Sequence, residues 1–294
     1  MAHRAGFVNI IGNPNVGKST LLNALLGEQL SITTPKAQTT RHRILGLLNG
    51  EDYQVVFSDT PGIINPGYAL QESMMDFVRS SFEDADIFLF MTEPNETQLK
   101  DPVFFERLTK VEVPVMVLVN KIDLSDQQAL EKVVTHWASL LPKAEIYPIS
   151  ALNKFNTPEV LQRILELLPE SPAYFSKEQL SDRDERFFVS EMVREQILNH
   201  YGKEIPYAVQ VEVEEFKEEE KIIRVRAIIY VERDTQKGII IGHQGKMIKR
   251  MGTDARKKME QFFKKKIFLE VFVKVRKNWR QSEEQLKRFG YNRK

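Results

Sequence analysis

A glycine-rich segment near the start of the sequence has the residue types and spacing of a phosphate-binding loop. Residues Gly12 to Ser19 read GNPNVGKS, which fits the pattern of glycine, four residues, glycine, lysine and serine. An apolar run precedes this segment and a helical pattern follows it, so backbone N–H groups and a positive helix end would face a phosphate. Lys18 would contact the β and γ phosphates, and the Ser19 hydroxyl would ligate Mg²⁺. A glycine turn before an ordinary helix is the simpler alternative, and the flanking elements disfavour it.

A second segment has the residues expected beside a γ phosphate. Asp59-Thr60-Pro61-Gly62 follows the second long apolar run of the sequence. The Asp59 carboxylate is suited to hold Mg²⁺ through water, and the Gly62 N–H is suited to contact the γ phosphate. Alone, these four residues would as readily form an ordinary β-turn. Their position downstream of the phosphate-binding loop favours the nucleotide role.

Residues that could select a guanine base lie at the ends of two later apolar runs. Asn120-Lys121-Ile122-Asp123 closes the run 115–119, and Ser150-Ala151 closes the next one. Asp123 can accept hydrogen bonds from guanine N1–H and the exocyclic amine, whereas adenine has no N1 proton. Because an unpaired buried charge costs about 3 to 5 kcal/mol, this carboxylate favours GTP over ATP. Lys121 would lie along the base, and the Ala151 N–H would approach O6.

The C-terminal part carries a different pattern, which indicates contact with RNA. Gly242-His243-Gln244-Gly245 joins two helical patterns, and its glycines would allow close approach of a phosphate, although such a pattern alone is usually a turn. The whole chain has a net charge of +1, but residues 221–294 hold 22 Lys/Arg and 7 Asp/Glu. A strongly basic end on an acidic body is expected where one part alone meets a polyanion. The runs 264–266 and 276–280 could equally be a solvated face, and Trp279 could be a core or a stacking residue.

The composition excludes several classes of site. The 294 residues include no cysteine, which excludes disulfides, iron–sulfur clusters, Cys-ligated zinc and thiol nucleophiles. None of the five His is paired with another at metal-ligand spacing. The sequence shows no signal-peptide core, and no apolar run approaches the roughly 18 residues of a membrane span. We therefore expect a cytoplasmic protein, and a peripheral contact of the basic end with the inner face of the cell membrane stays open.

The elements that must position the nucleotide motifs follow from the apolar patterns. From residue 7 to about 168, short continuous apolar runs alternate with segments whose apolar residues recur at spacing three and four. This βαβ repetition predicts an α/β domain with a doubly wound, mostly parallel sheet. Asn49-Gly50 is a hairpin signal, so the run 44–48 should pair antiparallel with the run 53–57 and make the sheet mixed. The expected strands are 7–11, 44–48, 53–57, 87–91, 115–119 and 146–149, and the expected helices are 18–26, 70–82, 104–109, 126–141 and 158–168.

The remainder predicts a smaller α+β domain in the order helix, strand, strand, helix, helix, strand. Its first helix is expected over 187–201, and its strands alternate apolar and polar residues around 209–213, 223–229 and 267–275. Pro169, Ser171 and Pro172 end the last helix of the first domain. We therefore place the first domain at 1–170, a linker at 171–186 and the second domain at 187–294.

Taken together, these motifs resemble the Era family of GTPases over nearly the whole chain. The five nucleotide-binding elements match at 12–19, 38–42, 59–62, 120–123 and 149–151, and the basic end is similar to a type II KH domain. The resemblance implies a P-loop GTPase domain that binds GTP or GDP with Mg²⁺. It also implies binding to the 3′ end of small-subunit (16S) ribosomal RNA, to the 30S subunit or its precursor, and a role in maturation of that subunit. We expect the protein to be a monomer.

The resemblance assigns a role to each matching residue. Lys18, Thr40 and Gly62 would be catalytic, and Ser19, Thr40 and Asp59 would hold the metal, with Thr40 reaching it only when the γ phosphate is present. The GTP-binding residues would be Gly12, Asn13, Asn15, Val16, Gly17, Lys18, Ser19, Thr20, Asp59, Gly62, Asn120, Lys121, Asp123, Ser150 and Ala151. The RNA-binding residues would be Ile241, Gly242, His243, Gln244, Gly245, Lys246, Lys249 and Arg250.

One position departs from the pattern of Ras-like GTPases. Ile63 stands where a glutamine that positions water would be expected, so intrinsic hydrolysis should be slow and should await an outside group. His42 is a weak candidate for a substitute base, because a His on an Arg-flanked loop is more often a solvated residue. By similarity to related GTPases, Asn15 is a candidate ligand for K⁺ near the β and γ phosphates.

Two other classes of function account for parts of the sequence. A P-loop kinase or ATPase would use the same loop, but Asp123 favours guanine and no second substrate site is evident. A passive RNA-binding protein would hold its nucleotide as a structural element. The leading hypothesis is a switch in which GTP and Mg²⁺ order the segments near Thr40 and Gly62 and favour RNA binding until hydrolysis.

Overall fold

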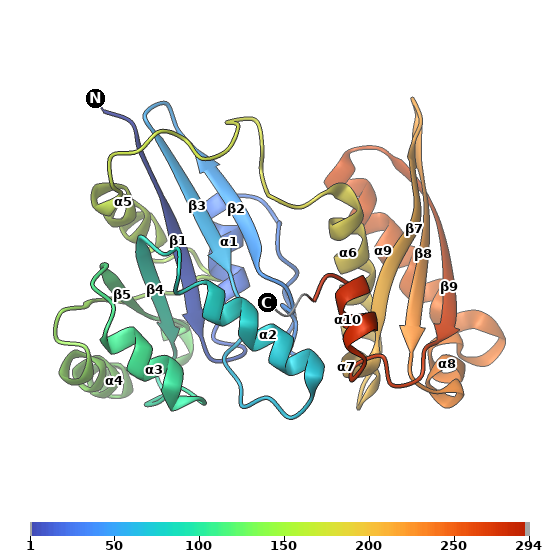
Figure 1. Cartoon of the computed structure of the whole chain (residues 1–294), viewed down its shortest axis with the longest axis horizontal. Helices are drawn as coiled ribbons and strands as arrows, with labels where there is room; N and C mark the ends of the chain where they lie inside the picture. The colour runs from blue at the N-terminus through green and yellow to red at the C-terminus, as the bar shows by residue number, and fades with distance from the viewer. Residues whose placement is uncertain (1, 292–294) are drawn as a thin grey trace. The chain divides into compact units, whose positions relative to one another are not determined.

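The computed structural model describes residues 2–291, which form two compact units (Figure 1). The first unit contains residues 2–67 and Gln71–Asp182. The second contains Tyr68–Leu70 and residues 183–291. The division places the end of the first unit at Asp182, within the segment 171–186 that the sequence suggests as a linker.

The first unit is built on a six-stranded sheet with the strand order β2-β3-β1-β4-β5-β6. Only β2 is antiparallel to its neighbour, which confirms the prediction of a mixed, mostly parallel sheet. The strands are β1 (Arg4–Gly12), β2 (Ile44–Asn49), β3 (Tyr53–Asp59), β4 (Ile87–Thr92), β5 (Val115–Val119) and β6 (Glu145–Pro148). The helices are α1 (Lys18–Leu26), α2 (Ala69–Ser80), α3 (Pro102–Thr109), α4 (Gln127–Leu140) and α5 (Thr157–Leu167).

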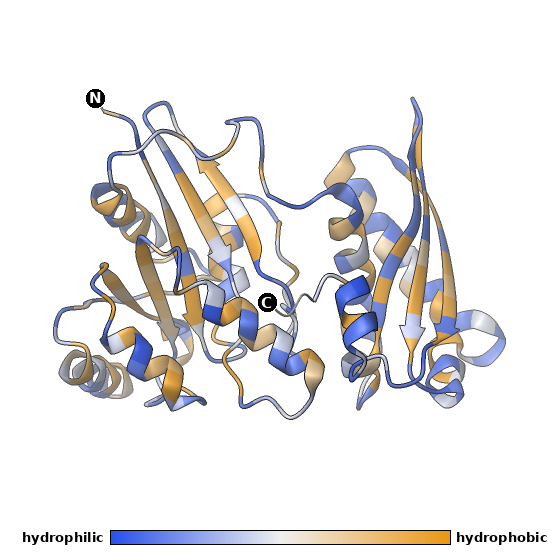
Figure 2. Ribbon diagram, in the orientation of Figure 1, coloured by the Kyte–Doolittle hydropathy of each residue, from blue (hydrophilic) through white to orange (hydrophobic). Residues whose placement is uncertain are grey.

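The continuous apolar runs form strands because helices cover the sheet on both faces. In Figure 1, α2 and α3 lie in front of the sheet, and α1 and α5 lie behind it. All six residues of β4 are buried, as expected for a strand covered on both sides. The hairpin at Asn49-Gly50 is confirmed, since Ile44 pairs with Asp59 across the antiparallel ladder. Figure 2 shows the apolar residues concentrated along the strands.

The segment that follows α5 runs along the edge of the first sheet. The Leu47 N–H donates to the Leu180 carbonyl at 3.0 Å, and the Ser181 hydroxyl donates to the Leu45 carbonyl at 2.6 Å. Gln54 of β3 donates to the Phe175 carbonyl at 2.9 Å. These bonds satisfy the open edge of β2, so this polar segment has a defined path.

The second unit has a three-stranded sheet with the order β7-β8-β9, in which β7 and β8 are antiparallel and β8 and β9 are parallel. Its main helices, α6 and α9, pack against each other and against the sheet. The elements are α6 (Glu185–His200), α7 (Ile205–Ala208), β7 (Gln210–Glu218), β8 (Ile222–Val231), α8 (Asp234–Ile241), α9 (Lys246–Phe263), β9 (Lys266–Val275) and α10 (Glu283–Arg288). The predicted order of the main elements is confirmed, while the short helices α7 and α10 were not anticipated.

Local interactions explain two further details of this unit. Helix α6 begins at Glu185 rather than at the expected Phe187, because the Asp184 carboxylate accepts a hydrogen bond from the Phe187 N–H at 2.9 Å and caps the helix. Trp279 is a core residue, since it is fully buried and its Nε1–H donates to the Ala208 carbonyl at 3.0 Å. Trp279 therefore packs in the core and does not present its ring for stacking on a base.

Candidate nucleotide site and candidate RNA groove

The phosphate-binding loop joins β1 to α1, and its two glycines are required by its shape. Gly12 has φ 151°, and a Cβ there would lie 2.3 Å from the Met91 carbonyl oxygen. Gly17 has φ 102° and caps α1, and a Cβ there would lie 2.2 Å from Asn120 Nδ2. Both positions combine a conformation that favours glycine with a contact that excludes a side chain. The backbone can therefore curl tightly at the N-terminus of α1, where an anion is stabilised.

Lys18 is buried at the base of this loop. Its Nζ donates to the Gly12 carbonyl at 3.1 Å and to the Asn13 carbonyl at 2.8 Å. Burial lowers the pKa of Lys18 to about 8, and the negative charges of Asp59 and Glu96 oppose that shift. The ammonium group is thus held by two backbone carbonyl oxygens of the phosphate-binding loop.

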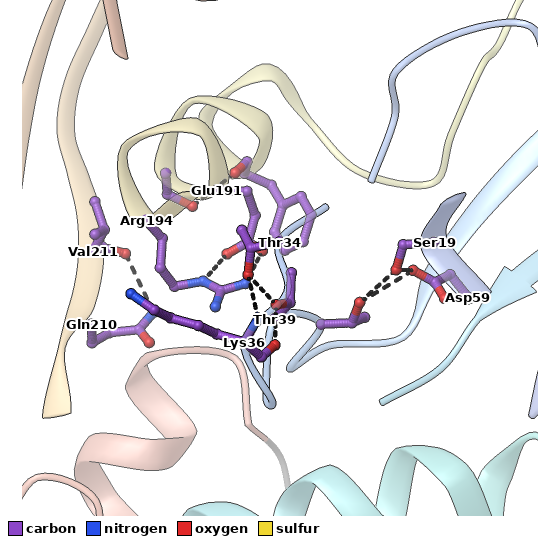
Figure 3. A network of polar contacts seen from close by, with 12 residues as sticks. Ser19, Thr34, Lys36, Thr39, Asp59, Glu191, Arg194, Gln210 and Val211 are labelled. Atoms are coloured by element: carbon purple, nitrogen blue, oxygen red, sulfur yellow. Dashed lines mark hydrogen bonds and ion pairs between the residues drawn. The ribbon is translucent and has the colours of Figure 1, made fainter. Parts of the chain in front are cut away.

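Three oxygen-bearing side chains converge beside Lys18. Ser19 Oγ lies 2.6 Å from Asp59 Oδ2 and 2.8 Å from Thr40 Oγ1, and Thr40 Oγ1 donates to Asp59 Oδ2 at 3.3 Å. Figure 3 shows Ser19 and Asp59 joined in this way. Burial raises the pKa of Asp59, which lies at the end of β3. The three residues expected to hold a metal are therefore brought together.

This oxygen cluster fits Mg²⁺ by its chemistry. Within residues 2–291, the buried Asp59 Oδ1 has no hydrogen-bond partner, so one carboxylate oxygen is left for a ligand. The same part of the chain contains no group of three or more His, Asp or Glu suited to a metal, so a site here depends on one carboxylate and two hydroxyls. Hard oxygen ligands of this kind suit Mg²⁺, which retains several waters and is also held by phosphates.

Asn120 braces the base-binding side of the site. Its Nδ2 donates to the Val16 carbonyl at 2.7 Å, and its Oδ1 accepts from the Ala151 N–H at 2.9 Å. The side chain thus ties the phosphate-binding loop to the segment after β6. Lys121 has φ 64°, and its Nζ pairs with Glu93 Oε2 at 2.6 Å. Asp123 is exposed in the short 3-10 turn that follows.

Most of the expected GTP-binding residues line one cavity of about 490 Å³. They are Asn15, Gly17, Lys18, Ser19, Thr20, Gly62, Asn120, Lys121, Asp123 and Ser150, and the metal candidate Thr40 joins them. Gly12, Asn13, Val16, Asp59 and Ala151 are outside this lining. Val16 and Asp59 are fully buried.

Asn13 differs from the other loop residues because its side chain is bound elsewhere. Its Nδ2 donates to Glu96 Oε1 and to the Gln98 carbonyl, each at 3.0 Å, and its Oδ1 accepts from the Lys100 N–H at 2.9 Å. The Asn13 side chain therefore anchors the loop between β4 and α3. Any contact of Asn13 with a phosphate must come from its backbone.

The segment 32–40 forms the other wall of the cavity; the sequence motifs include its end at 38–40, but residues 32–35 were not predicted to be site residues. Ile32, Thr33, Thr34 and Pro35 line the cavity. Figure 3 shows the local network that shapes this segment, in which the Thr34 and Thr39 hydroxyls lie 2.7 Å apart and the Thr39 hydroxyl donates to the Lys36 carbonyl at 2.6 Å. For residues 32–35, the sequence offers only threonines beside a proline, and this pattern has no fixed spacing that would identify a site.

Two residues discussed for hydrolysis have unexpected surroundings. His42 is 6% exposed, and its ring lies 5.7 Å from the ring of Phe77, so the expectation of a solvated residue is wrong. Helix α2 covers this part of the loop, which the sequence pattern could not show. Asn15 has φ 68°, and its Nδ2 donates to the Pro35 carbonyl at 3.0 Å, so the Asn15 side chain joins the phosphate-binding loop to the opposite wall.

In the second unit, the two glycines of the GxxG segment shape the connection between α8 and α9. Gly242 has φ 70°, Gly245 has φ 73° and Gln244 has φ 53°. A Cβ on Gly242 would lie 2.6 Å from Met247 Cγ, so this position has no room for a larger residue. His243 and Gln244 are exposed at the tip, as a loop that contacts a nucleic-acid backbone requires.

A hollow of about 260 Å³ between α9 and β9 forms a candidate base-binding groove. It is lined by Ile248, Lys249, Gly252, Thr253, Arg256, Leu269 and Val271. Only Lys249 belongs to the set expected from the sequence. Leu269 and Val271 were not recognised as site residues, although the alternating pattern of β9 places them on the helix-facing side. The groove has an apolar floor and a basic rim, which suits stacked bases and phosphates.

Searched across residues 2–291, the helices include none with the length and apolar character needed to cross a membrane.

Comparison with known proteins identifies two domains and one family. Residues 7–121 match the family model described as a 50S ribosome-binding GTPase, and residues 204–280 match the KH domain. The chain is 43% identical to GTPase Era of Caldanaerobacter subterraneus subsp. tengcongensis, over 99% of each chain. It is 44% identical to GTPase Era of Geotalea daltonii, over 98% of this chain and 97% of that protein.

Solved structures agree with these relatives. A crystal structure of Era in complex with MgGDPNP and nucleotides 1506–1542 of 16S ribosomal RNA matches with a TM-score of 0.94 and 36% identity, over 99% of this chain and all of that one. A variant of Aquifex aeolicus Era bound to GDP and AlF₄⁻ also matches with a TM-score of 0.94 and 36% identity, over 99% of this chain and all of that one. With a phosphate-binding loop, a guanine-selective motif and a KH domain in one chain, this protein belongs to the Era family of GTPases.

Proposed function

We propose that this GTPase is a switch that binds the 3′ end of small-subunit ribosomal RNA through its KH domain and assists maturation of the 30S subunit. The observation that carries the proposal is the pairing of two sites on one chain. One is the cavity that unites Lys18, Thr40 and Gly62, and the other is the groove between α9 and β9. The Era structure that holds MgGDPNP together with 16S ribosomal RNA supports both halves of the proposal.

The proposed recognition of GTP begins at the base. Asp123 accepts from guanine N1–H and the exocyclic amine, and Lys121, held by Glu93, lies along the base plane. Asn120 keeps these residues in register with the phosphate-binding loop through its bonds to Val16 and Ala151. ATP is rejected because adenine cannot satisfy the carboxylate.

The phosphate end of the site supplies positive charge and hydrogen-bond donors for hydrolysis. Mg²⁺, held by Ser19, Thr40 and Asp59, would neutralise charge on the β and γ phosphates when it is bound with GTP. Lys18 adds a second cationic group at these phosphates. The Gly62 backbone N–H would contact the γ phosphate; a Cβ on Gly62 would lie 2.6 Å from Pro14 Cα, so only glycine permits this segment to approach the phosphate-binding loop so closely. These groups stabilise charge that develops in the transition state.

The site lacks a side chain that could activate water at the usual position, because Ile63 stands where Ras-like GTPases carry a glutamine. Ile63 is fully buried, and its N–H donates to the Gly12 carbonyl at 3.0 Å. The Ile63 side chain therefore cannot orient water, and slow intrinsic turnover follows. A monovalent cation such as K⁺, held with the help of Asn15, would supply part of the missing transition-state charge.

The proposed RNA contact combines close phosphate approach with base stacking. Gly242 and Gly245 let the backbone approach a single strand, and His243, Gln244 and Lys246 surround that point. Ile241 ends α8 directly before the loop, and Lys249 and Arg250 continue the basic surface on α9. We further propose that the protein acts as a monomer in the cytoplasm, and that any membrane contact is peripheral and made by the basic end.

GTP turnover with and without RNA tests the proposed function. Hydrolysis is measured with the full chain, Mg²⁺ and a synthetic oligonucleotide with the 3′-end sequence of small-subunit ribosomal RNA. A switch should hydrolyse GTP slowly alone and respond to the RNA, and ATP should not compete. A passive RNA-binding protein would bind the oligonucleotide and show no turnover, and a kinase would require an acceptor. Either result would contradict the proposal.

A further inference from the structure

A second cavity, of about 740 Å³, lies in the GTPase unit next to the nucleotide cavity. The two cavities share Pro14 and Gln38 in their linings. The second cavity extends away from the base, toward α3 and α4. Its volume lies within the roughly 300 to 1,000 Å³ of sites that hold small organic ligands. The proposed GTP and RNA contacts leave this cavity unused.

The lining of the second cavity is mainly apolar and carries one charge. Its apolar part is Pro14, Ala37, Ile64, Leu99, Pro102, Phe105, Trp137 and Leu140. Leu99 and Trp137 are almost fully buried, at 6% and 1% exposure, so they form the floor, whereas Leu140 is 41% exposed and forms part of the rim. Among the described residues that line the cavity, Lys100 has the only charged side chain. The other lining residues are uncharged and polar, so an apolar floor with Lys100 as the one cationic residue of the lining complements an amphipathic anion.

The backbone of Lys100 is fixed from both sides, and its side chain is exposed. Its N–H donates to Asn13 Oδ1 at 2.9 Å, and its carbonyl accepts from Asn65 Nδ2 at 3.1 Å. Asn13 belongs to the phosphate-binding loop, and Asn65 follows Gly62 by three residues. A continuous chain of hydrogen bonds therefore runs from the phosphate-binding loop, through the cavity wall, to the segment proposed to contact the γ phosphate.

The opposite wall also belongs to a nucleotide-responsive part of the molecule. Ala37 and Gln38 line the second cavity, and they directly precede the Thr39-Thr40 pair at the proposed metal site. A molecule in the cavity would contact residues on both segments that GTP is proposed to order. Its affinity must then depend on the nucleotide whenever those segments change position.

We propose that this cavity binds a small amphipathic anion, with an apolar body against Leu99, Phe105 and Trp137 and a carboxylate, sulfonate or phosphate group at Lys100. Occupancy of the cavity is coupled to the nucleotide state through Gln38 and Asn65. The site is separate from the GTP and RNA sites and would act as a regulatory site of the GTPase unit.

Anilinonaphthalene sulfonate is a suitable probe, because it is a planar aromatic anion whose fluorescence rises in apolar surroundings. It is titrated into the full-length protein loaded with GDP and, separately, with a non-hydrolysable GTP analogue. Methyl NMR of Ile64, Leu99 and Leu140 locates the bound probe. We expect shifts at these methyl groups, and affinities in the two nucleotide states that differ by at least about fivefold.

Two variants and one control identify the contacts. Lys100→Met should weaken probe binding roughly tenfold, since it removes a charge-assisted hydrogen bond. Leu140→Trp should block the cavity from its rim. Lys132→Met, at an exposed position of α4 outside the cavity lining, should leave the affinity unchanged. Binding of fluorescent GDP verifies that each variant is folded.

The proposal is overturned by methyl shifts that avoid the cavity, or by equal probe affinity in the wild type and Lys100→Met. Probe binding in the cavity with the same affinity in the GDP and GTP-analogue states would overturn the coupling.

Discussion

Single side chains at the nucleotide site divide into those that build its frame and those left open to a ligand. Asn120 belongs to the frame, because both ends of its amide bind other segments, whereas Asp123 is exposed. We predict that Asp123→Asn weakens GTP binding and favours xanthosine triphosphate, whose C2 oxygen can accept a hydrogen bond from the new amide. Competition against a fluorescent guanine nucleotide measures both affinities. An unchanged preference for GTP would remove Asp123 from the base site.

Asn15 is the residue at which ion dependence should appear. Its side chain joins the phosphate-binding loop to Pro35, and both residues line the nucleotide cavity. If a monovalent cation supplies transition-state charge, hydrolysis should be faster in K⁺ than in Na⁺ at equal ionic strength, and Asn15→Ala should reduce that difference. Steady-state phosphate release in the two salts provides the measurement, and equal rates would exclude a role of the monovalent cation in hydrolysis.

At the scale of elements, the connection between α8 and α9 carries the proposed RNA contact. We predict that replacing His243 and Gln244 with Asp sharply lowers affinity for a single-stranded ribosomal oligonucleotide, because like charges would face its phosphates. GTP affinity should stay near wild type, and Gln261→Asp, at an exposed position near the other end of α9, should have little effect. With about four phosphate contacts, the wild-type log-log salt slope should be near −3. Fluorescence anisotropy over a salt series measures this slope, and a slope near zero would exclude the basic face as the RNA-binding surface.

A hydrogen bond also joins the end of α6 to the end of α8. The Tyr201 hydroxyl donates to the Ile240 carbonyl at 2.7 Å, two residues before Gly242. Tyr201→Phe should therefore lower the free energy of unfolding by about 1 kcal/mol near neutral pH. Urea unfolding followed by circular dichroism measures this change.

The pH dependence of this bond has a definite sign. Burial raises the pKa of Tyr201 to about 12 in the folded protein, from an ordinary value near 10. Above pH 10 the unfolded chain releases the phenolic proton first, so the stabilisation is present below pH 10 and is lost as the pH rises toward 12. The stability difference between wild type and Tyr201→Phe should shrink over that interval. A stability difference that stays constant between pH 10 and pH 12 would contradict the raised pKa of Tyr201.

At the scale of the whole molecule, the central question is whether GTP and RNA influence each other. If GTP raises RNA affinity, linkage requires RNA to raise the affinity for a GTP analogue by the same factor, typically about 5- to 150-fold. The oligonucleotide is titrated into protein loaded with GDP or with the analogue, and the reciprocal nucleotide titration follows. Identical RNA affinities in the two states would mean that the two domains act independently, because a ligand that does not discriminate between states cannot shift them.

Several features of the protein could be predicted from its sequence because they depend on local constraints. Gly12 and Gly17 are required by their own backbone conformations, and β4 is apolar throughout because it is covered on both faces. The order of strands and helices follows from such periodic patterns. Motifs at strand ends must meet at one edge of a parallel sheet, so the assembly of most of the nucleotide cavity was foreseeable.

Other features were decided only by the tertiary structure, because periodicity shows which face of an element is buried and not what it meets. Asn13 belongs to the phosphate-binding motif, yet its side chain anchors the loop before α3. The sequence predicts a solvated His42, whereas in the structure Phe77 of α2 covers its ring. The candidate RNA groove exists only because β9 supplies Leu269 and Val271 opposite α9. The second cavity arises where segments distant in the sequence pack side by side, and no local pattern encodes a space that only their packing creates.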